Sequence, residues 1–203
     1  MVAILDYGIG NISSIKNMLK KIGVKAEITK DEAMISQASK LILPGVGHFD
    51  YCMQQLKMSS FFSLLEKRVL IDKIPVLGVC VGCQMLMENS EEGKEPGLGW
   101  IKGQVIRFNP TISSHPIKIP HMGWTDVNPV GLQPLYESIV DPRFYFVHSY
   151  HLVCNNNSSV TGTAEYGYAF TASVQQENIM GVQFHPEKSH KFGMKLYLNF
   201  SHL

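Results

Sequence analysis

Residues 74–86, IPVLGVCVGCQML, constrain the fold more than any other part of the chain. An apolar run of strand length leads into Gly-x-Cys-x-Gly and then into a segment of helical character. This order is typical of a nucleophile elbow, a sharp and strained turn that lifts a nucleophile out of a sheet. A Cβ on either flank of the nucleophile would collide with neighbouring backbone, which explains Gly78 and Gly82. The segment therefore predicts an α/β protein with a buried strand that ends at Cys80.

The first half of the chain alternates strand-like runs with amphipathic segments. Residues 12–22 carry apolar side chains at positions 12, 15, 18, 19 and 22, which is the spacing of a helix with one buried face. Strand, helix and strand in this order are typical of a parallel sheet with crossover helices. The expected strands are 2–6, 25–29, 40–43 and 75–79, and the expected helices are 12–22, one from about residue 31, and one or two within 49–70.

From residue 100 onward the apolar runs are shorter, more polar and interrupted by Pro and Gly, which is typical of antiparallel strands. The expected strands are 103–108, 117–120, 144–147, 159–164, 169–175 and 179–184, and a helix is expected over 189–200. A length of 203 residues fits one domain. We therefore expect a single α/β domain over residues 1–203, with a mostly parallel central sheet flanked by helices and an antiparallel β annex in the second half.

Composition excludes several classes of function. The 18 basic and 17 acidic residues give no excess charge that would favour a nucleic-acid partner. The longest apolar stretch, residues 74–87, is too short to span a membrane, and the N-terminus does not resemble a signal peptide. The four cysteines follow no secreted disulfide framework, so we expect reduced thiols and a cytoplasmic location.

The elbow motif makes Cys80 the candidate nucleophile. A position at the start of a helix favours the thiolate, and the same turn aims the N–H of Val81 at a developing oxyanion. Cys80 and Cys83 also form a C-x-x-C pair, so a redox dithiol stays open as an alternative, as does an inert buried thiol. Zinc needs about four ligands, and the sequence has no second C-x-x-C or H-x₃-H pair. We expect no metal and no organic cofactor.

A cysteine nucleophile needs a proton acceptor, and His185 is the best candidate among the eight histidines. It ends an apolar run and is followed by Pro186 and Glu187. In extended backbone, positions i and i+2 lie on the same side, so Glu187 can accept from one ring nitrogen while the other faces Cys80. The competing histidines are His48, His121, His148 and His151. Of these, His148 and His151 lie next to Ser149-Tyr150 and could line a pocket, but neither has a carboxylate two residues away.

These motifs resemble a known family. GVCVGCQ at 78–84 and QFHPEKS at 183–189 together are similar to the class I (triad-type) glutamine amidotransferases. The segments DYGIGN at 6–11, LPGVGHF at 43–49 and PHMGW at 120–124, with HSY at 148–150, resemble the branch formed by the glutaminase subunits of imidazole glycerol phosphate synthase. The resemblance spans nearly the whole chain.

The resemblance implies a chemistry. Cys80 would attack the carboxamide of L-glutamine to give a thioester, while His185, oriented by Glu187, would protonate the departing ammonia and then activate water. Backbone N–H groups of the elbow and of the loop at 45–47 would bind the oxyanion. The residues that it assigns to substrate binding are Gly45, Val46, Gly47, Val81, Gln84, Ser149 and Tyr150.

The resemblance also implies a partner. Asn11, Trp124 and Lys188 would face a (β/α)₈ cyclase subunit, which would form a heterodimer with this chain and use the ammonia in histidine biosynthesis. One residue departs from the pattern, because Thr125 stands where the family usually has asparagine. Paralogous subunits feed ammonia to synthases that amidate cell-surface sugars. That role stays open as an alternative, and so does a thiol–disulfide protein that uses Cys80 and Cys83.

Overall fold

A central sheet forms the framework of the computed structural model, which describes residues 1–113 and 115–203. Among these residues twelve strands share the sheet, nine of them along the path β2-β1-β3-β4-β12-β11-β10-β7-β8. The remaining three extend it, since β5 pairs with β6, β6 with β9, and β9 with β11. The strands are β1 Val2–Leu5, β2 Ala26–Thr29, β3 Lys40–Leu43, β4 Val76–Val79, β5 Asn89–Ser90, β6 Gly103–Arg107, β7 His121–Pro129, β8 Arg143–His148, β9 Tyr150–Cys154, β10 Val160–Glu165, β11 Ala169–Gln176 and β12 Ile179–Val182.

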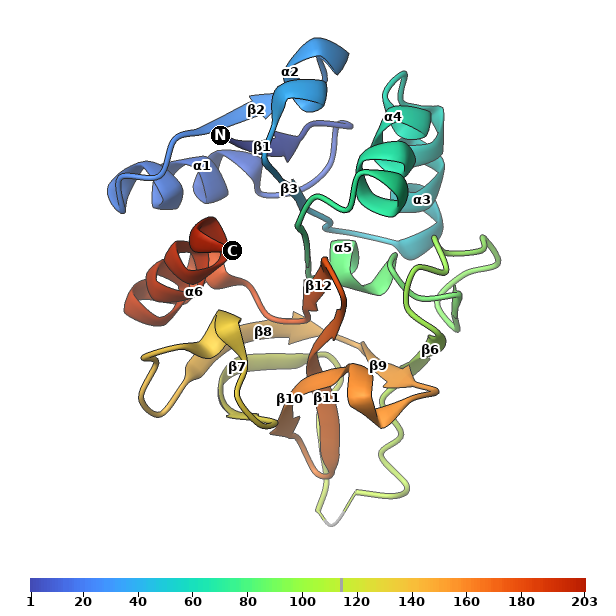
Figure 1. Ribbon diagram of the computed structural model, residues 1–203. Coiled ribbons are helices and arrows are strands. Elements are labelled where there is room, and N and C mark those ends of the chain that lie inside the picture. The colour runs from blue at the N-terminus through green and yellow to red at the C-terminus, as the bar shows by residue number, and fades with distance from the viewer. Residues whose placement is uncertain (114) are drawn as a thin grey trace.

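The half of the sheet from β2 to β12 is parallel, as the strand–helix alternation predicts. Every residue of β1, β4 and β12 is buried, which is the pattern of strands covered on both faces. Helices α1 and α6 lie on one side of this half, and α2, α3 and α4 lie on the other (Figure 1). The helices are α1 Ile12–Lys21, α2 Glu32–Gln37, α3 Phe49–Met58, α4 Phe62–Glu66, α5 Val81–Gln84 and α6 His190–His202.

Local signals explain where these helices form. Ile15 and Leu19, one turn apart on α1, are the residues of that helix that are fully buried. Asp31 caps α2 by accepting hydrogen bonds from the N–H groups of Ala33 (2.7 Å) and Met34 (3.2 Å). The expected one or two helices within 49–70 are α3 and α4, and a π-helical turn over Lys67–Ile71 follows them.

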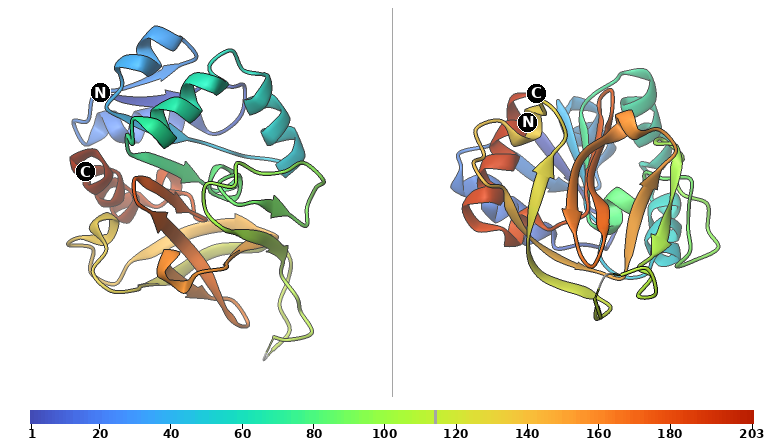
Figure 2. Two further views of the ribbon diagram at one scale, coloured as in Figure 1. Left: turned by 45° about the vertical axis from the view of Figure 1, so that its right-hand side comes forward. Right: turned by 90° about the horizontal axis from the view of Figure 1, so that it is seen from below.

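The other half of the sheet is antiparallel from β12 through β11, β10 and β7 to β8. It projects from the parallel half as a separate lobe, with β6 and β9 beside it (Figure 2). The expected antiparallel annex is therefore confirmed. Within the described residues, no helix is both long and apolar enough to cross a membrane.

One expected strand is wrong, and three observed strands, β5, β7 and β9, were not predicted. Residues 117–120 form no strand, because Pro116 and Pro120 lack the N–H that a ladder needs. Instead β7 begins at His121, immediately after Pro120. The strand β5 is only two residues long, and β9 is short and does not alternate polar with apolar side chains. In β7 polar residues are mixed with Met122 and Trp124, which are exposed, so no buried period is visible.

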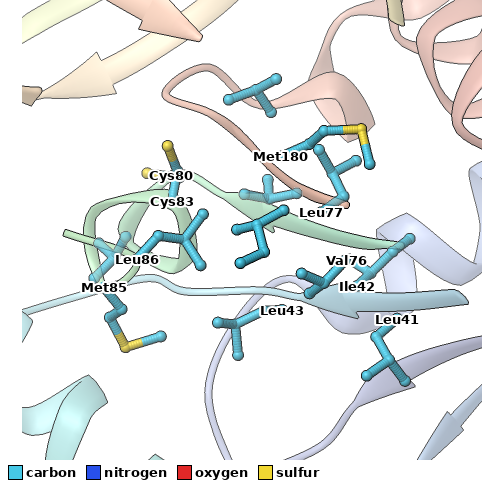
Figure 3. Packing of buried hydrophobic residues seen from close by; sticks show 14 of the residues in the cluster. Leu41, Ile42, Leu43, Val76, Leu77, Cys80, Cys83, Met85, Leu86 and Met180 are labelled. Atoms are coloured by element: carbon cyan, nitrogen blue, oxygen red, sulfur yellow. The ribbon is translucent and has the colours of Figure 1, made fainter. Parts of the chain in front are cut away.

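The hydrophobic core is packed directly beneath the elbow. Figure 3 shows side chains of β3 and β4 meeting the residues that follow Cys80, so the turn is supported on its inner side by well-packed apolar groups. The fully buried members of this group include Leu41, Ile42, Leu43, Val76, Leu77, Cys83, Met85 and Leu86. This packing fixes the turn as rigidly as the sheet itself.

Candidate active site

The elbow holds Cys80 in a strained backbone conformation. Its φ of 56° and ψ of −114° lie where residues other than glycine are rare. A Cβ at Gly82 would collide with the carbonyl oxygen of Leu43, and one at Gly78 would lie 2.6 Å from the carbonyl oxygen of Gly82. The two glycines of the motif are thus required by backbone contacts, as the sequence predicts.

The helix after the elbow is shorter than expected. α5 contains four residues, with hydrogen bonds from the N–H of Gln84 to the carbonyl oxygen of Cys80 (3.2 Å) and from that of Met85 to Val81 (2.9 Å). One turn of helix carries only a small dipole. The main electrostatic influence on the Cys80 sulfur must therefore come from a charged side chain.

That side chain is His185, which follows β12, lines the same cavity as Cys80 and interacts with it electrostatically. Its Nδ1 is 2.8 Å from Oε1 of Glu187, and both side chains are almost fully buried. The way in which Glu187 reaches His185 differs from the expectation, because the segment Pro186–Lys188 is a 3₁₀ turn rather than extended backbone. Ser189 closes this turn by donating its hydroxyl to the carbonyl oxygen of His185 at 2.6 Å.

The charges around His185 favour its protonated form. Burial by itself lowers the pKa of His185, but Cys80 and then Glu187 oppose burial and raise the pKa to about 10. The ring therefore carries a proton at neutral pH. In cysteine nucleophiles generally, an imidazolium beside the sulfur favours the thiolate, which is the reactive form.

A cavity of about 260 Å³ opens in front of Cys80 and His185. It brings together most of the residues that the sequence assigns to substrate binding, although they come from three distant segments. The predicted residues that line it are Val46, Gly47, Cys80, Val81, Gln84, Ser149, Tyr150, His185 and Lys188. Gly45 lies behind the elbow instead, where a Cβ would collide with the backbone nitrogen of Gly82.

Gln84 is fixed at the wall of this cavity. Its Nε2 donates to the carbonyl oxygen of Tyr150 (3.3 Å) and to Oε1 of Gln183 (3.1 Å). Because both bonds use the amide nitrogen of Gln84, its amide oxygen is the group that is left to bind a ligand.

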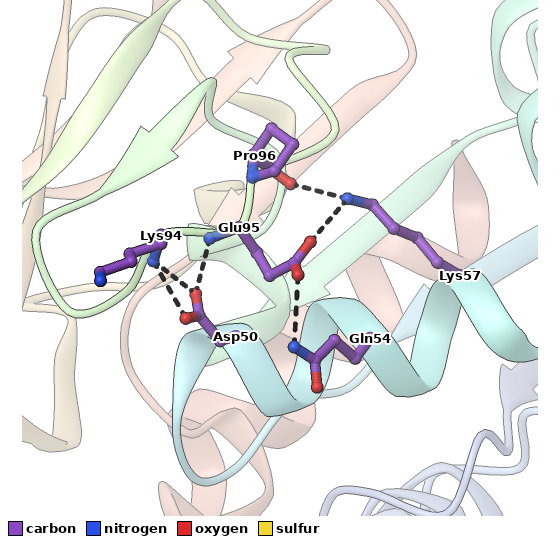
Figure 4. A network of polar contacts seen from close by, with 6 residues as sticks. All are labelled: Asp50, Gln54, Lys57, Lys94, Glu95 and Pro96. Atoms are coloured by element: carbon purple, nitrogen blue, oxygen red, sulfur yellow. Dashed lines mark hydrogen bonds and ion pairs between the residues drawn. The ribbon is translucent and has the colours of Figure 1, made fainter.

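Glu92 lines the cavity and was missed by the sequence interpretation. Its Oε2 accepts a hydrogen bond from the N–H of Phe49 at 2.9 Å. Asp50, which follows Phe49 on α3, accepts hydrogen bonds from the N–H groups of Lys94 and Glu95, each at 2.9 Å. Figure 4 shows Asp50 clamping this loop onto α3. A Cβ at Gly93 would collide with the Asp50 carboxylate. In the sequence, Gly93 after Glu91 and Glu92 is a local sign of a tight turn at this loop, but it does not indicate that Glu92 lines a cavity.

Two residues of β8 also line the cavity: His148, for which the sequence allowed a place in a pocket, and Val147, which was not predicted. His148 is buried on β8, where its ring contacts other aromatic side chains. No sequence pattern links this strand to the elbow, because the two meet only through the pairing order of the sheet.

The three residues assigned to a partner lie near the cavity but not in one place. Lys188 lines both the cavity and a neighbouring hollow that includes Asn11, so these two residues share one surface. The Lys188 ammonium lies 5.8 Å from the centre of the Tyr145 ring. Trp124 meets the same ring edge-on at 6.2 Å and stacks on His190 at 5.6 Å.

The arrangement of the thiols does not favour a dithiol. Cys83 is fully buried and packs against β12, where a Cβ at Gly181 would lie 2.5 Å from its sulfur. Burial raises the pKa of the Cys83 thiol well above its usual value. All four cysteines are free. In the described part of the chain, no group of three or more His, Cys, Asp or Glu side chains is arranged to hold a metal ion.

Comparisons with known proteins agree with this geometry. The chain is 50% identical over 201 residues to "Imidazole glycerol phosphate synthase subunit HisH 2" of Methanococcus maripaludis, with 98% of each chain covered. It is 49% identical to the protein of the same name from Pseudomonas aeruginosa, with 100% of each covered. A third relative, "Imidazole glycerol phosphate synthase subunit HisH" of Bdellovibrio bacteriovorus, is 45% identical over 204 residues and also covers 100% of each chain.

Solved structures show the same fold at low identity. "Structure of PurLQS from Thermotoga maritima" superposes with a TM-score of 0.73 at 16% identity, covering 98% of this chain and 96% of that one. "Crystal structure of glutamine amidotransferase" gives a TM-score of 0.73 at 20% identity, with 100% and 99% covered. The family described as "Glutamine amidotransferase class-I" matches residues 3–202. With a strained elbow cysteine, a buried His–Glu pair and these relatives, the chain belongs to the class I glutamine amidotransferases.

Proposed function

We propose that this protein is the glutaminase subunit of an imidazole glycerol phosphate synthase, and that Cys80, His185 and Glu187 hydrolyse L-glutamine to glutamate and ammonia. The observation that carries the proposal is that Cys80, held at a positive φ, shares one cavity with His185, whose Nδ1 is bonded to Glu187. The relatives' names, which are those of imidazole glycerol phosphate synthase subunits, support the assignment to that synthase.

The first half of the reaction forms a thioester. The Cys80 sulfur attacks the carboxamide carbon, and the C–N bond breaks as the His185 imidazolium gives its proton to the departing nitrogen. Ammonia leaves, and His185 becomes neutral. In the second half, His185 takes a proton from water while that water attacks the thioester carbon. The C–S bond then breaks, so glutamate is released and the Cys80 sulfur and the protonated His185 are restored.

Each tetrahedral intermediate carries a negative oxygen that needs donors. Val81, Val46 and Gly47 line the cavity beside Cys80, and their backbone N–H groups are the candidates. One such donor contributes about 3 kcal/mol to the barrier in related acyl transfers.

The cavity also suits the amino-acid end of glutamine. Glu92 supplies a negative charge for the α-ammonium group, and Gln84 Oε1 supplies a hydrogen-bond acceptor. Backbone groups of Ser149 and Tyr150 complete the wall. These assignments extend the sequence prediction, which did not include Glu92.

For the partner, we propose a cyclase subunit with a (β/α)₈ barrel that docks over Asn11, Trp124 and Lys188, with both subunits in the cytoplasm. The continuity of the two hollows at Lys188 supports this location, because ammonia released at Cys80 would leave beside the docked partner. A second candidate partner, a synthase that amidates cell-surface sugars, is favoured by Thr125 on the same strand as Trp124.

The test is ammonia release from glutamine by the wild type, Cys80→Ser and Cys83→Ser, each with and without a cyclase barrel and its ribonucleotide substrate. We expect stimulation of the wild type and of Cys83→Ser, and no release by Cys80→Ser. Glutamine cleavage that the barrel leaves unchanged would move the partner to sugar amidation. Equal loss in both cysteine variants would contradict the triad.

A further inference from the structure

Three polar side chains that the proposed reaction does not use form a continuous chain of hydrogen bonds to the cavity wall. Thr125 Oγ1 lies 2.8 Å from His121 Nε2. His121 Nδ1 lies 2.9 Å from His148 Nε2, and His148 Nδ1 lies 2.7 Å from the carbonyl oxygen of Tyr150. We call Thr125, His121 and His148 the histidine relay.

The pairing of two strands and a glycine in one of them build the relay. His121 on β7 is directly opposite His148 on β8. Thr125 is four residues further along β7, which in a straight strand would place it roughly 13 Å away. Between them Gly123 has a φ of 143°, a backbone conformation that residues with a Cβ rarely adopt, and the Thr125 hydroxyl reaches the His121 ring across this glycine.

Aromatic neighbours hold both rings in place. The His121 ring lies between Tyr166 and Phe146, at centroid distances of 4.1 Å and 5.1 Å and near-parallel to both. His148 packs against Phe108 at 5.1 Å. Both histidines are buried, so neither ring has room to rotate away from its partners.

The relay has a defined direction. A carbonyl oxygen only accepts, so His148 must donate its Nδ1–H to Tyr150. Burial lowers the pKa of His148 to about 3 and that of His121 to about 4, so both rings are neutral at neutral pH. His148 Nε2 then accepts from His121 Nδ1–H, and His121 Nε2 accepts from the Thr125 hydroxyl.

The end of the relay is the point that orients Gln84. The carbonyl oxygen of Tyr150 accepts from His148 and also from Gln84 Nε2. We propose that the histidine relay consists of positioning residues, which fix the Tyr150 carbonyl and through it the Gln84 side chain for glutamine binding. This inference rests on the proposed function and adds Thr125, the residue that departs from the family pattern, as the first donor.

The kinetic test compares two variants at one position. Thr125→Val keeps the branched shape and removes the hydroxyl, whereas Thr125→Ser keeps the hydroxyl. With the partner barrel present, we expect Thr125→Val to raise KM for glutamine about three- to ten-fold, the effect of one net hydrogen bond, with a smaller change in kcat. Thr125→Ser should restore wild-type KM. Equal KM in the wild type and Thr125→Val, or equal loss in both variants, would overturn the proposal.

The spectroscopic test does not depend on activity. In the wild type, ¹⁵N NMR of the imidazoles should show protonated Nδ1 and bare Nε2 for both His121 and His148. Thr125→Val should shift the His121 nitrogens, because Nε2 loses its donor, and Thr125→Ser should not. A protonated Nε2 on either ring, or unchanged shifts in Thr125→Val, would overturn the relay. If the wild-type complex releases no ammonia, the proposed function fails, and these shifts still decide the relay.

Discussion

The parallel and antiparallel halves of the sheet contribute different things to the site. The parallel half supplies the groups that react, because Cys80 follows β4 and His185 follows the neighbouring β12. The antiparallel half supplies groups that position, because Tyr150 and the histidine relay lie on β7, β8 and β9. Reactive groups are thus placed by adjacent strand ends, whereas positioning groups depend on pairing between distant strands. Variants of the first kind should lower kcat, and variants of the second kind should raise KM.

The largest expected effect is that of Cys80→Ser in the parallel half. A serine hydroxyl beside His185 is a much weaker nucleophile than a thiolate, so kcat for ammonia release should fall at least about 10³-fold. Steady-state ammonia assays with the partner present measure this. Cys83→Ser is the matched control, since Cys83 packs in the core and should keep nearly full kcat. Substantial turnover by Cys80→Ser would contradict the assignment of the reacting groups to the parallel half of the sheet.

The next effect is that of Glu187→Gln. Glutamine keeps an acceptor for the His185 Nδ1–H but removes the negative charge, so the pKa of His185 should fall below its value of about 10. By analogy with other triads, kcat should fall about 10²- to 10³-fold with little change in KM. A pH profile of kcat in both proteins tests this. If Glu187→Gln raised KM alone, Glu187 would belong with the positioning residues.

Backbone packing at the elbow gives a third prediction. Gly82→Ala places a Cβ against the carbonyl oxygen of Leu43 and should lower the free energy of unfolding by about 3 kcal/mol or more. Gly131→Ala is the control, because Gly131 has a φ of 72° but open space around it, so its cost should be about 1–2 kcal/mol. Urea unfolding of both variants measures the difference. Similar losses would mean that the elbow is less tightly packed than its contacts indicate.

Acid should affect the antiparallel half first. The pKa values of His121 and His148, about 4 and about 3, lie below the usual value of 6.5. Their neutral forms therefore stabilise the fold above pH 6.5, and this stability is lost as the pH falls toward 4. Between pH 6.5 and 5 we expect a loss of about 3 kcal/mol for the two rings together. His185 works in the opposite direction, since its raised pKa contributes stability that is fully present below pH 6.5 and is lost as the pH rises from 6.5 to about 10.

Urea unfolding at pH 7, 6 and 5 checks the acid effect. His121→Gln removes one titrating ring and should flatten the dependence over this interval. A wild-type stability that stays constant from pH 7 to 5 would show that the rings are not held neutral.

The two halves also differ in how far the sequence predicts them. The elbow at 74–86 and the His-Pro-Glu segment at 185–187 are contiguous motifs, so the sequence alone is enough to name their residues. The strand β7 is not predictable in this way, because its polar surface hides the period of a strand and its register is set by β8 and β10. Glu92 escaped for a similar reason, since the contact that places it joins residues 43 positions apart.

The most direct test of the account uses a glutamine analogue with an electrophilic carbon in place of the carboxamide. Incubated with the partner complex and digested for mass spectrometry, the protein should carry one adduct, on Cys80, which excess L-glutamine prevents. Cys83→Ser should be labelled like the wild type, and Cys80→Ser should not be labelled. An adduct on Cys83, or no adduct that glutamine competes for, would contradict Cys80 as the nucleophile of a glutaminase.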